Sequence, residues 1–167
     1  MAIQMAVSTG YLPIVQYLIN ATNIQRVYEP PRIGRGPKYQ SLLDDAANYG
    51  HLQIVQYLVD LGADPKYPRV LESAIERGNL QVVQYLVDKG ADPNNKTALQ
   101  RAAVGGYLQV VQYLVEKGAD PNNKTALKCA IWGGHHQVAE YLSSARLCTG
   151  AHTNGHNNGS VENIIWD

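Results

Sequence analysis

One short pattern recurs five times along the chain and constrains its fold more than any other feature. Its copies begin at Gly10 (GYLPIVQYLI), Gly50 (GHLQIVQYLV), Gly78 (GNLQVVQYLV), Gly106 (GYLQVVQYLV) and, in a degenerate form, Gly134 (GHHQVAEYL). The last four copies are evenly spaced, and the interval before them is one period plus an insertion. A fixed period of about 28 residues is typical of a solenoid, in which each unit buries its apolar face against its neighbours.

Each unit is predicted to contain two helices, named here helix A and helix B. In the unit from Thr97 to Pro121, Thr97 is a candidate N-cap, and helix A places Leu99, Ala102 and Ala103 on one face. Gly105 and Gly106 then break the helix. Helix B is predicted from about Leu108 to Lys117, because Leu108, Val111, Leu114 and Val115 form an apolar stripe opposite Gln109, Gln112 and Glu116. Gly118 and the Asp120–Pro121 pair favour a helix end and a turn.

The units resemble ankyrin repeats. The segment TALQRAAVGGYLQVVQYLVEKGADPN and its copies are similar to the family pattern T-P-L-H-x-A-A…G-H-L-x-V-V-x-L-L-L-x-x-G-A-D. The Pro and His of the family tetrapeptide are absent, since Ala98 and Gln100 stand there in one copy and Ala126 and Lys128 in the next. The period is also shorter than the family's usual period of about 33 residues, and the missing residues fall where the family has its β-hairpin fingers.

The resemblance implies an all-α ankyrin-repeat solenoid of stacked helix–turn–helix units with shortened β-hairpin fingers. We expect about five repeats in residues 1–147, an inserted loop near residues 22–40, and a flexible tail in residues 148–167. The tail is rich in Asn, Gly, Ser and Thr, and its segment VENIIW is a candidate docking motif, edge strand or cap over the last repeat.

Composition excludes several classes of protein. With 14 basic and 14 acidic residues the chain is neutral, which argues against a nucleic-acid-binding protein with a broad basic face. No apolar run is long enough to cross a membrane. Two cysteines are fewer than a secreted disulfide scaffold usually has, so we expect a cytoplasmic protein. Short repeats with VQYLV-type helices resemble arrays of large DNA viruses and some intracellular bacteria, which often act as host-directed adaptors; a viral chain would act in the host cytoplasm.

No catalytic motif, metal site or cofactor site is predicted with a recognisable spacing. A cluster of potential ligands is nevertheless present towards the C-terminus, at Cys129, His135, His136, Cys148, His152 and His156. None of these residues has the close Cys-x2-Cys spacing that zinc sites use. His135 and His51 occupy the turn position of their repeats, which favours a structural role. The repeated tyrosines are interpreted as a packing ladder on helix B, at Tyr17, Tyr57, Tyr85, Tyr113 and Tyr141.

Two further features are candidates for contacts. The insertion carries Arg26, Arg32, Arg35 and Lys38 against Glu29, which predicts either a solvated loop or a basic loop for an acidic partner or phosphate. The first repeat is apolar and uncharged, although a terminal unit normally needs a polar outer face. This predicts either a fragment of a longer array or self-association through the N-terminal repeat.

By resemblance, a partner protein contacts the concave face formed by successive A helices. Positions expected on that face vary between copies, while the scaffold between them repeats almost letter for letter. The residues predicted to bind a partner are Asp44, Asn48, Tyr49, Glu72, Glu76, Arg77, Gln100, Arg101, Val104, Lys128 and Trp132. Tyr49 and Trp132 are the candidate aromatic anchors. Acidic residues gather in the early copies and basic residues in the later ones, at Asp44, Asp45, Glu72 and Glu76 against Arg101 and Lys128.

The sequence therefore favours a non-enzymatic module that binds another protein, without nucleic acid or membrane. Two alternatives stay open: a metal-binding or catalytic protein that uses the C-terminal His/Cys cluster, and a structural or degenerate repeat fragment without a partner.

Overall fold

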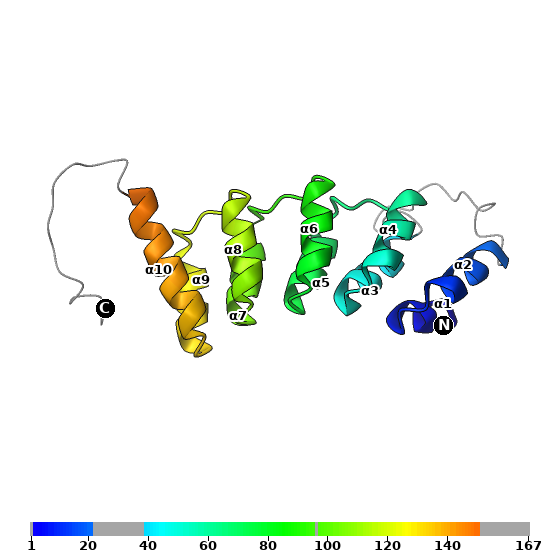
Figure 1. The fold of residues 1–167 in the computed structure, drawn as a ribbon, viewed down its shortest axis with the longest axis horizontal. Helices are drawn as coiled ribbons and strands as arrows, with labels where there is room; N and C mark the ends of the chain where they lie inside the picture. The colour runs from blue at the N-terminus through cyan, green and yellow to red at the C-terminus, as the bar shows by residue number, and fades with distance from the viewer. Residues whose placement is uncertain (1, 22–38, 96, 151–167) are drawn as a thin grey trace, which may run out of the picture.

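The computed structural model describes residues 2–21, 39–95 and 97–150, and within these ranges all regular structure is helical. The helices pair into five units that follow one another in a single row (Figure 1). They are α1 (Ala2–Ser8), α2 (Leu12–Ala21), α3 (Gln40–Tyr49), α4 (Leu52–Asp60), α5 (Pro68–Glu76), α6 (Leu80–Asp88), α7 (Ala98–Val104), α8 (Leu108–Glu116), α9 (Lys124–Trp132) and α10 (His136–Gly150). The predicted all-α solenoid of stacked two-helix units is confirmed.

Successive units stack A helix on A helix and B helix on B helix. Thus α1, α3, α5, α7 and α9 form one layer, while α2, α4, α6, α8 and α10 form the other. Small residues let the A helices approach closely, and Ala102 and Ala103 on α7 are fully buried, as the apolar pattern predicted. On α8 the buried residues include Val110, which the predicted stripe omitted. A single continuous core therefore runs through all five units.

The connectors between units are turns rather than hairpins. No β-strand is present in the ranges that the structure describes, which agrees with the predicted loss of finger length. The Asp of each GADP segment forms a turn through its own side chain: Asp92 Oδ1 accepts from the amide of Asn94 at 2.9 Å, and Asp120 Oδ1 from that of Asn122 at 2.9 Å. An Asp side chain that binds the backbone two residues ahead mimics a backbone turn, so the chain reverses without a finger.

The residue after each turn glycine ties its repeat to the preceding one. His51 Nε2 lies 3.0 Å from the carbonyl of Ser8, and His135 Nε2 lies 2.8 Å from that of Val104. Because a carbonyl oxygen can only accept a hydrogen bond, Nε2 of each histidine carries a proton and donates it. Gly106, with φ of +70°, lies directly under the ring of His135, and a Cβ there would come within 2.3 Å of Nδ1. This close approach explains the need for glycine at the position.

The tyrosine ladder is confirmed for the later repeats. Tyr57, Tyr85, Tyr113 and Tyr141 are partly buried against the core, and the hydroxyl of Tyr113 donates to the carbonyl of Gln84 in the preceding repeat, at 3.4 Å. Burial and nearby Asp88 raise the pKa of Tyr113, so its hydroxyl keeps the proton that it donates. Tyr17 differs, because its side chain is 70% exposed.

Two details differ from the sequence-based expectations. Thr97 precedes α7 as predicted, but its side chain does not cap the helix and instead donates to Glu72. In the next repeat the cap is Asn123, whose side chain accepts from the amides of Thr125 and Ala126. The inserted loop lies outside the described residues except for Tyr39 and Gln40. Helix α10 continues to Gly150, into the segment predicted as the tail, and the rest of the tail lies outside the described residues.

Candidate functional site

The residues predicted to bind a partner all lie on one layer of the array. They occupy α3, α5, α7 and α9, with Arg77 directly after α5, and none of them is buried. The apolar faces of these helices point into the core, which leaves the variable positions accessible. Repeat-to-repeat variation therefore located a set of accessible positions on the A helices.

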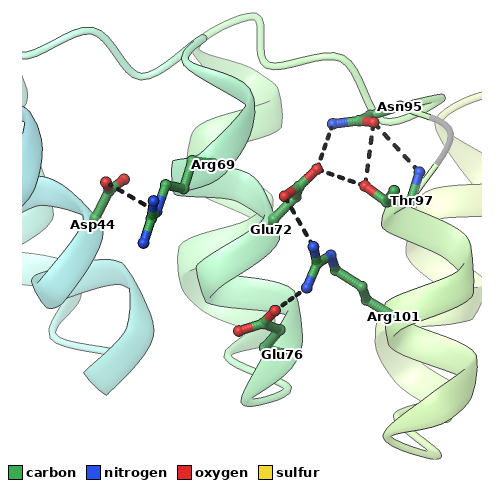
Figure 2. Close-up of polar contacts among 7 residues, drawn as sticks. All are labelled: Asp44, Arg69, Glu72, Glu76, Asn95, Thr97 and Arg101. Carbon is green, nitrogen blue, oxygen red and sulfur yellow. Dashed lines mark hydrogen bonds and ion pairs between the residues drawn. The ribbon is translucent and has the colours of Figure 1, made fainter. Parts of the chain in front are cut away.

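Three of these residues meet in a charged cluster between α5 and α7 (Figure 2). The guanidinium of Arg101 contacts Glu76 through Nη1 and Glu72 through Nη2, the second at 3.3 Å. Glu72 Oε1 also accepts hydrogen bonds from the hydroxyl of Thr97 at 2.5 Å and from the side-chain amide of Asn95 at 3.3 Å. One arginine and two polar side chains thus hold both carboxylates in place.

The cluster corrects the predicted division into an acidic early face and a basic later face. Arg101, assigned to the later face, pairs with Glu72 and Glu76 of the early face, so its positive charge is compensated there instead of adding to a basic face. Sequence reasoning did not find Thr97 and Asn95 as members of the cluster. The available signal was spacing, since Arg101 follows Glu72 by 29 residues and Glu76 by 25, both close to one repeat period.

A third carboxylate, on Asp44 of α3, is poorly compensated. Its Oδ2 lies 3.7 Å from Nε of Arg69 on α5, whose side chain is 75% exposed (Figure 2). Its Oδ1 is buried and has no hydrogen-bond partner among the described residues. Burial therefore raises the pKa of Asp44 to about 6, with Arg69 opposing the rise and Asp45 adding to it. Burial raises the pKa of Asp45 as well. Arg69 was not among the predicted site residues.

Two further contacts lie at the C-terminal ends of the A helices, one between neighbouring repeats and one within a repeat. Arg77 Nε donates to Asn48 Oδ1 at 3.4 Å, and the ring of Tyr49 stacks on His51 with 6.3 Å between centroids. This stacking still leaves Tyr49 52% exposed. The ring is therefore held in orientation by its neighbour while its outer face stays accessible.

A cavity of about 420 Å³ opens on the same layer between α5, α7 and α9. It is lined by Glu76, Thr97, Gln100, Arg101, Val104, Gly105 and Cys129. Within the described residues, Nε of Arg101 is buried and has no acceptor. A group that entered this cavity would meet apolar carbon from Val104.

Two exposed apolar side chains of this layer lie at the ends of α7 and α9. Val104 is 58% exposed and Trp132 is 83% exposed, which is the highest value among the large hydrophobic residues of the described ranges. Lys128 lies one turn before Trp132 on α9 and is also exposed. The structure thus places two apolar groups and a cation within the last two A helices.

The C-terminal His/Cys cluster does not assemble in the part of the chain that the structure describes. No group of three potential ligands is found there, and Cys129 is a free thiol. His135 instead makes the contact with Val104, which supports the structural interpretation of the turn histidines. The side chains of Cys148, His152 and His156 lie outside the description. None of the described helices is both long and apolar enough to cross a bilayer.

Comparison with known families agrees with the observed architecture. A family model for ankyrin repeats in three copies matches residues 71–155, and a model for a single ankyrin repeat matches residues 39–68. Together these matches cover more than half of the chain. A comparison with curated proteins gave no match. The α1–α2 unit precedes both matches, but it stacks on α3 and α4 as the later units stack on one another.

Proposed function

The chain belongs to the ankyrin-repeat family, and from that premise we propose that it binds a partner protein through the exposed layer of its A helices. Ankyrin repeats generally mediate protein–protein interaction, and the family is typically non-enzymatic. The observation that carries the proposal is the contrast between the two sides of each A helix. Buried positions of the A helices carry the same or similar apolar residues from unit to unit, whereas most exposed positions of the same helices vary between units.

The proposed contact centres on the C-terminal ends of the A helices. Tyr49, Val104 and Trp132 are exposed there, and large aromatic residues are the usual anchors of protein interfaces. Because the connectors are short turns, the A-helix layer is the more extensive varied surface. We infer that the partner chain runs across several repeats and contacts one variable side chain on each.

The cavity between α5, α7 and α9 supplies a place for one partner side chain. Its volume of about 420 Å³ and its Val104 wall suit an apolar group.

The test is capture of the partner by variants of the chain. Immobilised parent protein is used to isolate binding proteins, which are identified by mass spectrometry, and the affinity of a purified candidate is then measured by calorimetry. Tyr49→Ala combined with Trp132→Ala is expected to weaken binding about 1,000-fold, since each anchor residue contributes about 2 kcal/mol.

Tyr67→Ala is the matched control, because Tyr67 is 43% exposed but lies in a connector, before α5. It is expected to leave the affinity unchanged. Equal binding by the parent and the double variant would refute the site. A cytoplasmic adaptor role belongs to the same proposal, and localisation of the tagged chain in cells tests it.

A further inference from the structure

One position on helix B is buried in every unit except the first. Ile14 is 49% exposed, whereas its counterparts Ile54, Val82, Val110 and Val138 are at most 1% exposed. Val138 is buried although no described unit follows it, and Ile14 is exposed although a unit does follow it. The position must therefore face the preceding repeat. The α1–α2 unit presents this stacking face without a described repeat against it.

Two tyrosines of the first unit belong to the same stacking face. Tyr11 is 62% exposed, and it occupies the place after the turn glycine that is taken in later units by His51, Asn79, Tyr107 and His135. Each of those four side chains contacts a backbone carbonyl of the preceding A helix, and the hydroxyl of Tyr107 donates to the carbonyl of Glu76 at 3.1 Å. Tyr17 is the first of the repeated helix-B tyrosines, of which Tyr113 donates a hydrogen bond to the preceding repeat.

The last unit exposes the opposite stacking face. Ile131 on α9 is 57% exposed, while its counterparts Val7, Ala47, Ile75 and Ala103 are fully buried. The same argument applies in reverse: Val7 is buried in the first unit, so this position faces the following repeat. At this end the carbonyl of Trp132 corresponds to those of Glu76 and Val104, which accept bonds from Tyr107 and His135.

The two end faces match each other at a third position. Met5 occupies the place of Arg101 in its repeat, and Trp132 occupies the place of Glu76. Between α5 and α7 this pair of positions, Glu76 and Arg101, forms an ion pair. Between the two ends it would join a Met that is 68% exposed to a Trp that is 83% exposed, a favourable sulfur–aromatic combination. The α1–α2 unit carries no charged residue that would oppose the contact.

We propose that the α1–α2 face binds the α9–α10 face of a second copy, so that copies of the chain stack head to tail in the geometry of consecutive repeats. Ile14 of one copy packs where Val110 packs within the array, and the Tyr11 hydroxyl donates to the Trp132 carbonyl of the other copy. Such a contact is heterologous and leaves one free face at each end, so assembly continues beyond the dimer. Exposed apolar patches of this kind commonly mark interfaces.

The test is the mass of the 167-residue chain in solution, measured by sedimentation velocity from about 1 µM to about 1 mM, a range that includes weak protein affinities. The parent chain is expected to gain mass with concentration. Ile14→Glu and Ile131→Glu are each expected to remain monomeric, because each carries a charge in one of the two faces. Their mixture is expected to form a dimer and nothing larger, since only one intact pair of faces remains.

Val104→Glu is the matched control, because Val104 is similarly exposed but lies on neither end face; it should assemble like the parent. Far-UV circular dichroism checks that each variant keeps the parent's helical content. A parent chain that stays monomeric overturns the proposal, as does continued assembly of Ile131→Glu, which would indicate a face-to-face contact between first repeats. Capture of a partner by Ile14→Glu is independent of this outcome, so failure of self-association leaves the proposed partner site intact.

Discussion

Replacing Asp44 by Asn is expected to stabilise the array at neutral pH. The carboxylate of Asp44 has one buried oxygen without a hydrogen-bond partner in the described ranges, and its ion-pair partner Arg69 is largely in solvent. Burial accordingly raises the pKa of Asp44 from 3.8 to about 6. The carboxylate is thus harder to ionise in the folded chain than in the unfolded one, and an amide of the same shape avoids that penalty.

The magnitude follows from the pKa change. A rise of about two units corresponds to about 3 kcal/mol of stability. The side chain retains 19% exposure, and solvent screening reduces the expected effect to about 1–2 kcal/mol. The sign is fixed by proton binding: the folded chain holds this proton more tightly than the unfolded chain does. The stabilisation that the folded chain gains by holding this proton is therefore complete below pH 3.8, and it is lost as the pH rises through about 6.

Urea unfolding followed by circular dichroism, at about pH 4 and about pH 7, measures the effect. Asp44→Asn should exceed the parent in unfolding free energy by about 1–2 kcal/mol at the higher pH and by much less at the lower pH. Asp60→Asn, which changes an exposed carboxylate in the same repeat, should change stability little at either pH. A carbon-13 NMR titration gives the pKa of Asp44 directly. A native pKa at or below 3.8, or a variant less stable than the parent at neutral pH, would refute the reasoning.

Two further predictions concern the contacts between repeats. Gly106→Ala should lower the unfolding free energy by more than the roughly 1–2 kcal/mol that a left-handed residue costs, because its Cβ also meets His135. Gly134→Ala, where φ is +72° and no atom lies within 4 Å of the new Cβ, should cost only what the left-handed backbone costs. Equal losses in the two variants, measured by urea unfolding, would exclude the contact with His135. Arg101→Met should lower the unfolding free energy of the array by about 1 kcal/mol. A double-mutant cycle with Glu76→Gln should show a coupling energy that falls with added salt. Zero coupling at low salt would mean that the ion pair contributes nothing to stability.

The sequence was sufficient for the fold because one pattern was repeated. Apolar residues at helical spacing, the turn glycines and the Asp-Pro turns each appear several times, so a local ambiguity in one copy is resolved by the others. The A-helix core residues Ala102 and Ala103 and the two-helix unit were predictable in this way. Val110 was not, because it faces the neighbouring repeat rather than its own A helix, and a single unit contains no information about that second face.

Contacts of the site were less predictable because they join different repeats. The pairing of Arg101 with Glu72 and Glu76 depends on how far one A helix is offset from the next, which residue identities do not reveal. The pKa of Asp44 depends on the same offset, since it is set by how closely α3 and α5 pack and by the exposed position of Arg69. Variation between copies identifies the exposed positions, but it does not distinguish residues that contact a neighbour from residues that are available to a partner.

That distinction divides the candidate site into two groups. Charged residues of the first group already bond within the array: Asp44 with Arg69, and both Glu72 and Glu76 with Arg101. Substituting them changes the stability of the array together with any binding, so a loss of binding alone does not locate a contact. Gln100, Val104, Lys128 and Trp132 make no such ion pair within the described ranges, and all four lie on α7 and α9. Alanine at Trp132 is therefore expected to reduce partner affinity with an unchanged melting temperature, whereas Arg101→Met is expected to change both. If Trp132→Ala lowered the melting temperature as much as Arg101→Met, Trp132 would belong with the residues that hold the repeats together.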